Sequence, residues 1–367
     1  MQHRADFLYG SATGIGSMPH REAAAALELV QQTMPWGPHW PQLPQRSNHE
    51  SLIQQYLGPL LKLEMLDWEK GIPPFFVNDN YSWLEKAASF YELYLAFQEG
   101  KQKEEMLSLF AFPLAAAAGF YRFLDEKWDT LPWQPHFLKG QVCGPLSMGL
   151  QVNAGDQTSA FYHAELRAII TKALAFNARF QIRSLQKFSL PVVIMIDEPL
   201  LFFYGQLAGI SLSREQIVQS LKELVSAIRE EGAYAGVHCC SGADWSIIFE
   251  VSPHIVSFDA YSYFDSLLVY GAQVQSFLNK GGCLAWGLVP TTGEDLGAED
   301  ASSLKERFLQ GIRRLARQGV SKELLARQYL LTPSCGTGTL SVAQCTQIYG
   351  LTFELQKLLQ GHPGWYI

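Results

Sequence analysis

The residues with the clearest potential for chemistry are His238 and Cys240, which close a short apolar run at residues 232–240. Residues two apart in a strand point to the same face, so the imidazole and the thiol would project together while Cys239 points to the opposite face. Imidazole nitrogen and thiolate sulfur are both ligands that zinc binds in proteins. The pair therefore predicts half of a zinc site, and the other half must come from elsewhere in the chain.

Polar residues also end other apolar runs of the sequence. Asp197 and Glu198 follow the most apolar run, and Cys335 follows the last one. A buried charge needs a partner or a function, so these residues are not expected to be simple core filling. The polar residues at the predicted strand ends are Ser17, Asn78, Asp197, Glu198, His238, Cys240, Asp259 and Cys335.

Zinc in proteins takes about four ligands, and a catalytic site leaves one position to water or substrate. His238, Cys240 and Cys335 would supply three ligands, and Asp259 could be a fourth, exchangeable one. Each thiol taken alone is better explained as a small buried hydrophobic group, and the histidine as a hydrogen-bonded core residue. The occurrence of these residues together, at strand ends on one face, favours a metal site.

The Asp197-Glu198-Pro199 sequence admits two roles for its carboxylates. Side chains alternate along a strand, so only one of the two can point inward. An inward carboxylate could hold an amino group or act as a base. The alternative is that one of them caps the free amides of the following segment. Both roles hold together if Asp197 points inward and Glu198 caps.

A turn of small residues lies at positions 14–19, Gly-Ile-Gly-Ser-Met-Pro, between an apolar run and a helical pattern. Backbone amides at such a turn can bind an anion, a carboxylate as well as a phosphate. Gly16 and Ser17 are therefore candidate binding residues. The spacing of the glycines does not match the dinucleotide-binding fingerprint.

The elements that must position these residues alternate between strand and helix throughout. Eight such units predict the α/β class and a single (β/α)8 TIM barrel over residues 1–367, with an open doubly wound sheet as the alternative. A helical insertion is expected around residues 82–130, and the Trp-rich residues 35–45 are either a lid or a staple on the barrel base. The predicted strands are residues 7–17, 75–78, 136–145, 190–199, 232–240, 254–259, 282–287 and 329–335.

Composition excludes several classes of function. Of the 367 residues only 17% are charged, and the net charge of −7 argues against nucleic-acid binding. No apolar run reaches the length of a membrane helix, and the first residues lack the apolar core of a signal peptide. We therefore expect a cytoplasmic protein, in which the six cysteines are thiols or metal ligands.

The motifs together resemble the catalytic barrel of cobalamin-independent methionine synthase. That family belongs to a superfamily that includes uroporphyrinogen decarboxylase and the corrinoid-dependent thiol methyltransferases. The resemblance follows the chain in order and covers nearly all of it. It is carried by Ile-Gly-Ser-Met-Pro at 15–19, Gly144-Pro145, Ile-Asp-Glu-Pro at 196–199, His238-x-Cys240, Phe258-Asp259 and Pro-Ser-Cys-Gly at 333–336.

The resemblance implies a zinc-dependent transfer of a methyl group to a thiol. Zinc would be held by His238, Cys240, Cys335 and Asp259, where methionine synthase has Glu, and would activate the homocysteine thiol. Asp197 would hold the amino group of this substrate, and Gly16 and Ser17 would hold its carboxylate. The catalytic residues implied are Asp197, His238 and Cys240.

Three departures from the family leave the methyl donor open. The chain lacks the family's second barrel, residues 286–293 contain no histidine after the seventh strand, and residues 77–80 lack its folate-contacting acidic segment. The donor could be methyltetrahydrofolate or another methyl compound. The alternatives are a thiol methyltransferase that receives methyl from a corrinoid protein, and a barrel that binds zinc or a thiol without catalysis. The decarboxylase would need arginines that these strand ends lack.

Overall fold

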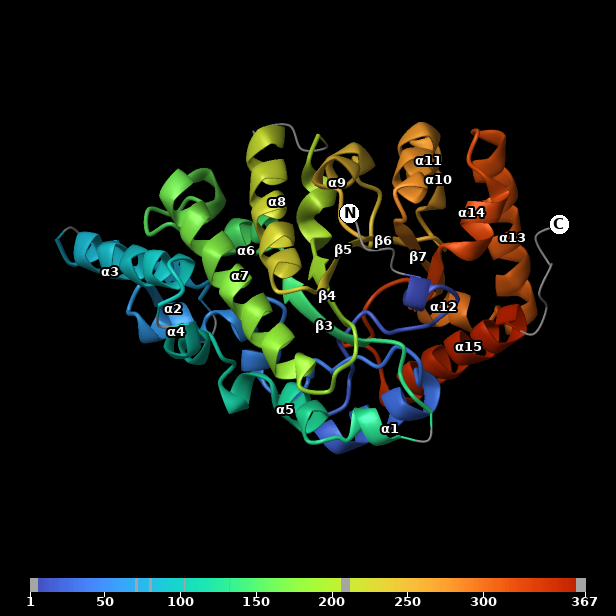
Figure 1. The fold of residues 1–367 in the computed structure, drawn as a ribbon, viewed down its shortest axis with the longest axis horizontal. Coiled ribbons are helices and arrows are strands. Elements are labelled where there is room, and N and C mark those ends of the chain that lie inside the picture. The colour runs from blue at the N-terminus through green and yellow to red at the C-terminus, as the bar shows by residue number, and fades with distance from the viewer. Residues whose placement is uncertain are drawn as a thin grey trace.

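A computed structural model describes residues 6–69, 72–78, 81–101, 103–131, 133–205 and 212–360. The protein belongs to the α/β class and contains a curled parallel sheet whose six strands follow one another in chain order (Figure 1). An open doubly wound sheet would need a reversal of strand order, so that alternative is wrong. The strands are β3 Leu138–Cys143, β4 Val192–Asp197, β5 Tyr234–Cys239, β6 Ile255–Asp259, β7 Cys283–Val289 and β8 Tyr329–Pro333.

Helices connect the strands and cover the outer face of the sheet (Figure 1). Because both faces of the strands are covered, almost every strand residue is buried, which explains the continuous apolar runs. The helices are α6 Pro145–Gln151, α7 Ala164–Gln186, α8 Arg214–Glu230, α9 Trp245–Val251, α10 Phe264–Leu268, α11 Gly271–Asn279, α12 Gly293–Leu296, α13 Ala301–Arg317, α14 Lys322–Arg327 and α15 Val342–Gln360. Within the described residues, no helix has the length and apolar character needed to cross a membrane.

The first predicted strand is wrong, and the second forms a strand that lies outside the parallel sheet. Residues 7–17 begin in the 3-10 helix η1 Asp6–Leu8 and continue as an extended segment with single bridges rather than a regular strand. Residues 75–78 contain β2 Phe75–Phe76, which pairs antiparallel with β1 Leu66–Asp67 outside the parallel sheet. Asn78 is therefore not at the end of a strand of the parallel sheet.

Two extended segments continue the hydrogen bonding from one edge of the sheet to the other. The amide of Thr13 donates to the Leu331 carbonyl of β8 at 3.0 Å, and the amide of Lys139 in β3 donates to the Pro38 carbonyl at 2.9 Å. These segments also bond to each other, because the amide of Met18 donates to the Gln42 carbonyl at 2.8 Å and the amide of Gln42 donates to the Gly16 carbonyl at 2.9 Å. The Pro- and Trp-rich segment thus borders β3. Its prolines lack amide donors, which prevents a regular strand.

Apolar side chains pack on both sides of the sheet. An outer cluster lies between strands and helices and includes Cys143. It also includes Cys239, which is predicted to point to the face opposite His238 and Cys240. An inner cluster fills the space enclosed by the sheet near the starts of the strands, and Cys283 is part of it. The inner cluster consists of Leu8, Phe137, Val193, Met195, Ile255, Cys283, Ala285 and Leu330.

A long stretch of short elements separates residue 42 from β3 and projects to one side of the molecule (Figure 1). The helical insertion predicted around residues 82–130 is interrupted after α4, because Pro113 cannot continue a helix and restricts the residue before it. The elements before β3 are α1 Ala23–Thr33, η2 Asn48–Glu50, η3 Gln54–Tyr56, α2 Gly58–Lys62, α3 Tyr81–Gln98, α4 Lys103–Leu109, η4 Leu114–Ala116, α5 Ala118–Leu124 and η5 Trp128–Thr130. Residues 79–80 belong to the stretch that lacks the family's folate-contacting acidic segment, and they lie outside the described residues.

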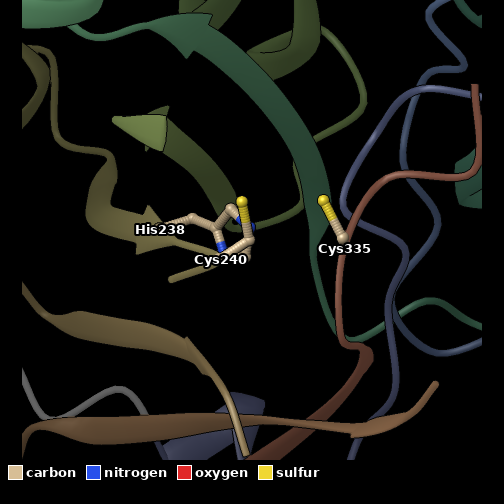
Figure 2. A group of neighbouring side chains, drawn as sticks. All are labelled: His238, Cys240 and Cys335. Atoms are coloured by element: carbon tan, nitrogen blue, oxygen red, sulfur yellow. The ribbon is translucent and has the colours of Figure 1, made fainter. Parts of the chain in front are cut away.

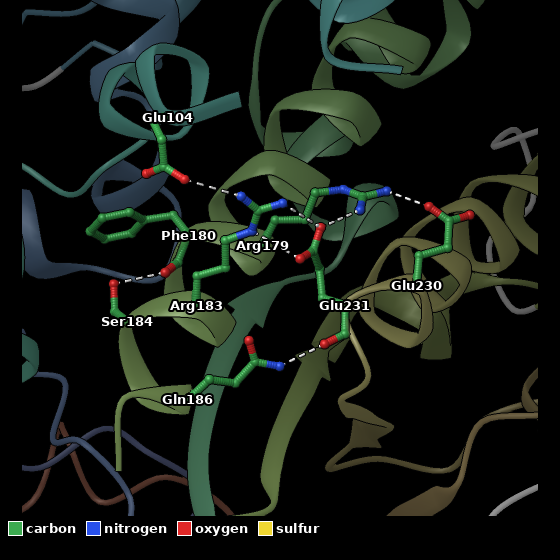
Figure 3. Close-up of polar contacts among 8 residues, drawn as sticks. All are labelled: Glu104, Arg179, Phe180, Arg183, Ser184, Gln186, Glu230 and Glu231. Carbon is green, nitrogen blue, oxygen red and sulfur yellow. Dashed lines mark hydrogen bonds and ion pairs between the residues drawn. The ribbon is translucent and has the colours of Figure 1, made fainter. Parts of the chain in front are cut away.

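A network of ion pairs joins α7 to α8 and to the projecting helices (Figure 3). Glu231 accepts from Arg179 at 2.7 Å and from Arg183 at 2.9 Å, and Arg179 also pairs with Glu230 at 2.6 Å. Arg183 reaches Glu104 of α4 at 3.5 Å. The Arg179 side chain is only 7% exposed, so its carboxylate partners offset a real desolvation penalty.

We expect Glu231→Ala to lower the free energy of unfolding by about 2–3 kcal/mol, because it removes charge-assisted hydrogen bonds from two arginines, one of them buried. Glu230→Ala is the matched control. Its side chain is 60% exposed, so its loss should be below about 1 kcal/mol. Urea unfolding followed by circular dichroism measures both, and equal losses would contradict this assignment.

Candidate metal centre

Three of the predicted ligands lie together at the carboxyl ends of β5 and β8. The ligand atoms of His238, Cys240 and Cys335 are all within 4.8 Å of one another. Figure 2 shows His238 and Cys240 side by side at the end of one strand, with Cys335 facing them from the segment after β8. His238 is buried and the two cysteines are partly buried. One imidazole and two sulfurs form a donor set typical of zinc.

The imidazole is oriented so that one nitrogen is left for a ligand. Nδ1 of His238 lies 2.9 Å from Oγ of Ser257, the residue opposite it on β6. Nε2 is buried and has no hydrogen-bond partner within the described structure. An orphaned buried polar atom costs about 1–3 kcal/mol, and a metal bond would remove that penalty. Metal-binding histidines are commonly fixed in this way by a bond to the second nitrogen.

The two thiols interact strongly with each other and with the histidine. The neighbouring Cys335 thiol lowers the pKa of Cys240 to about 4, and the adjacent imidazole of His238 with its charge lowers it further. The proximity of Cys240, together with burial, raises the pKa of Cys335. Burial opposes the charged imidazole, but Cys240 outweighs it and the pKa of His238 is raised. A bound cation would favour the thiolate form of both cysteines.

Asp259 stands apart from this group. Its Oδ1 accepts from the amides of Tyr261 at 2.9 Å and Ser262 at 2.7 Å, and so closes the turn after β6. The cluster of potential ligands contains His238 and the two cysteines without it. The role of Asp259 as an exchangeable fourth ligand stays a prediction.

Asp197 and Glu198 divide their roles between the interior and a helix end. Asp197 lies opposite His238 in the strand register, and its buried Oδ1 has no partner in the described structure. Burial raises its pKa to about 6, although the charges of His238 and Lys139 oppose this. Glu198 accepts from the amides of Leu146 and Ser147, both at 2.9 Å. It therefore caps a helix, but the helix is α6 of the preceding unit rather than its own following segment.

The Gly16-Ser17 turn is bound to the segment that carries Cys335. The Oγ of Ser17 accepts from the amide of Gly338 at 3.3 Å, and its carbonyl accepts from the amide of Thr337 at 2.9 Å. Gly16 has a φ of +145°, and a Cβ there would lie 2.8 Å from the Gln141 side chain, so glycine is required. Within the described residues, the amides of residues 14–17 have no hydrogen-bond partner. Their role in binding an anion stays a prediction.

Sequence reasoning missed Lys139 and Gln141, which point from β3 toward the interior of the sheet. Both side chains are buried. The signal was available, because they lie two apart in an otherwise apolar run, and two buried polar residues at that spacing share one face. Asn78, in contrast, donates to the Ala154 carbonyl at 2.8 Å and has a local role.

A cleft of about 720 Å³ opens beside the α6 end of the sheet. One wall is formed by residues that come after residue 42 in the chain, and the other by residues at and after the end of α6. Both walls therefore extend from carboxyl ends of sheet segments. Among the described residues that line it, none carries a formal charge. The lining consists of Pro44, Asn48, Ser51, Ile53, Gln54, Trp68, Ile72, Pro73, Pro74, Leu150, Gln151, Val152, Asn153, Gln157, Thr158 and Ser159.

The sequence matches no protein-family model and no curated protein sequence. Among solved structures, the chain is similar to a B12-independent methionine synthase from a Shewanella species in complex with selenomethionine. The TM-score is 0.55 and the sequence identity is 12%, and the match covers 96% of this chain and 98% of that chain. At this identity the similarity shows a shared fold, over nearly the full length of both chains.

We expect purified protein to contain one bound divalent metal per chain, measurable by mass spectrometry of metals. Cys335→Ala should lower its affinity about 100-fold or more, and Ser257→Ala about 10- to 100-fold, because Ser257 only orients His238. Competition with a coloured chelator measures both affinities. Cys283→Ala, at the opposite end of the strands, is the control and should bind metal normally. Unchanged binding in Cys335→Ala would show that this thiol is a core residue.

Proposed function

We propose that the protein is a zinc-dependent methyltransferase that transfers a methyl group to the thiol of a homocysteine-like amino acid, as methionine synthase does. One observation carries the proposal. A His-Cys-Cys group with an orphaned imidazole nitrogen lies next to an unpaired buried carboxylate, Asp197, on the adjoining strand. A metal site that only stabilised the fold would have no use for the carboxylate.

We further propose that the sheet is one closed eight-membered barrel over the whole chain. Residues 11–18 and 38–42 would occupy the first two strand positions, since they bond to β8, to β3 and to each other. Barrel enzymes carry their active sites at the carboxyl ends of the strands. His238, Cys240, Asp197 and Cys335 all stand at or just beyond such ends.

His238, Cys240 and Cys335 would hold the zinc, and Asp259 is the proposed fourth, exchangeable ligand. Bound zinc would keep the acceptor thiol ionised near neutral pH and leave it nucleophilic. The acceptor sulfur then attacks the methyl carbon. A sulfur–carbon bond forms while the bond between methyl and donor breaks, and the donor leaves with the electron pair.

The chain offers complementary groups for both charged ends of an amino acid. The unpaired carboxylate of Asp197 would pair with the substrate ammonium group. The free amides of residues 14–17 would bind the substrate carboxylate, with the amides of Gly16 and Ser17 closest to the Cys335 segment. These contacts orient the substrate with its thiol toward the metal group and favour homocysteine over simple thiols.

Methyltetrahydrofolate is the preferred donor in this proposal. The similar solved structure is named as B12-independent, which supports a donor other than a corrinoid. The 720 Å³ cleft could admit a donor. Its uncharged lining, which offers no cation to a folate carboxylate, keeps a methylated corrinoid protein as the second candidate. A barrel that binds zinc or a thiol without turnover is the third.

Incubation of purified protein with homocysteine and methyltetrahydrofolate should give methionine, detected by mass spectrometry. Methylcobalamin in place of the folate tests the corrinoid alternative. The His238→Ala, Cys240→Ala double variant should lose the activity, and retained turnover would exclude the metal mechanism. Bound metal without turnover from either donor would favour a binding protein.

Asp197→Asn should raise the KM for homocysteine about 10- to 100-fold, because a charge-assisted hydrogen bond to the ammonium group is lost. The KM for 1-propanethiol, which has no amino group, should not change. Steady-state kinetics with the two thiols measures the difference. An equal effect on both would place Asp197 in the chemical step or the fold rather than in recognition of the amino group.

A further inference from the structure

A lysine is buried inside the sheet with no role in the proposed chemistry. Lys139 is 2% exposed, and its Nζ donates to the Ile15 carbonyl at 2.6 Å and to Oε1 of Gln141 at 3.2 Å. A buried ammonium group is costly unless it is paired and hydrogen-bonded. Its placement on β3, one residue after the strand begins, therefore needs an explanation.

Lys139 shares a small enclosed cavity with Asp197 and His238. The cavity has room for about one water molecule at most, since its volume is about 10 Å³. Among the described residues lining this cavity, Lys139 is the one lysine or arginine and Asp197 the one carboxylate. The lysine thus lies directly beneath the groups that would bind the substrate amino acid.

The bond to Ile15 fixes the direction of the next amide. In a trans peptide the carbonyl and the following N–H point in opposite directions. The Ile15 carbonyl points to Nζ of Lys139 at 2.6 Å, so the amide hydrogen of Gly16 points away from the lysine. Within the described structure, that amide has no partner.

The neighbouring side chain holds the same turn in place. Gln141 packs against Gly16 so closely that a Cβ on Gly16 would lie 2.8 Å from its Cδ. Its Nε2 donates to the Trp40 carbonyl at 3.2 Å. Two polar side chains of β3 therefore support the turn from inside the sheet, one by a hydrogen bond and the other by packing.

We propose that Lys139 is a positioning residue for the amino-acid end of the acceptor: it holds the Ile15–Gly16 peptide so that the Gly16 amide faces the substrate carboxylate. This inference rests on the proposed function. Lys139 does not touch the substrate, and its removal frees the peptide to rotate. Recognition of the carboxylate is then weakened while the metal group, which lies on β5 and after β8, is retained.

Lys139→Met tests the proposal, because methionine fills similar space without a donor or a charge. Lys187→Met is the matched control, since Lys187 also donates to a backbone carbonyl, that of Leu124 at 2.9 Å, but on the surface. Binding of L-methionine is measured by calorimetry on the protein as purified. Steady-state kinetics is measured with homocysteine and with 1-propanethiol.

We expect Lys139→Met to retain its metal and to raise both the Kd for L-methionine and the KM for homocysteine about tenfold or more, the loss expected for one charge-assisted contact. The KM for 1-propanethiol and all values of Lys187→Met should stay within about twofold of wild type. A Lys139→Met protein that holds metal and binds L-methionine normally would overturn the inference and leave the proposed function intact.

Other outcomes separate the two proposals. Wild-type protein that binds neither L-methionine nor homocysteine would overturn the proposed function, and this inference with it. If Lys139→Met does not fold, Lys139→Gln decides, because the shorter glutamine cannot reach the Ile15 carbonyl. A folded Lys139→Gln should show the same selective loss, and wild-type affinity for L-methionine in that variant would contradict the role of Lys139.

Discussion

The parallel register of β4, β5 and β6 is the constraint on which the site depends. It places Asp197, His238 and Ser257 in one row, since each lies opposite the next in the sheet. Neighbouring strands are only about 4.8 Å apart, so a carboxylate, an imidazole and a hydroxyl are held side by side without help from loops. Ser257 occupies Nδ1 of His238, and this directs Nε2 to the cysteines. A one-residue slip of β5 would turn His238 toward the helices and bring Cys239 inward.

The remaining ligand depends on how the two ends of the chain meet. Cys335 lies after the last strand, where its segment is bonded to Ser17 through Thr337 and Gly338. Gly336 and Gly338 are needed there, because a Cβ on either would lie 2.1 or 3.0 Å from the Ser17 side chain. The contact that completes the metal group therefore also fixes the turn with free amides. In the proposed function, metal binding and recognition of an anion would therefore be coupled through the same segment.

The sequence predicts the six regular strands and the three clustered ligands because burial on both faces makes each strand a continuous apolar run, and polar residues then mark its end. It fails for the first two strand positions. Prolines and glycines in residues 11–18 and 38–42 allow only single bridges, whereas the more strand-like Phe75-Phe76 pairs elsewhere. Long-range pairing, not local preference, decides these positions. Asp259 shows the same limit, since the hydrogen bonds that hold its carboxylate come from amides of a turn that residue types alone do not reveal.

Lys139 shows how a polar residue inside an apolar strand can be informative. A methionine in place of Lys139 would be simpler for stability, because it would avoid the burial of an ammonium group. Its two hydrogen bonds instead go to the turn at Ile15 and to Gln141, and its charge faces Asp197 across a nearly filled cavity. The sheet interior therefore changes from an apolar cluster near the strand starts to a charged layer beneath the metal group. Such a layer has a physical purpose if the site above it must bind a molecule with both an ammonium and a carboxylate group.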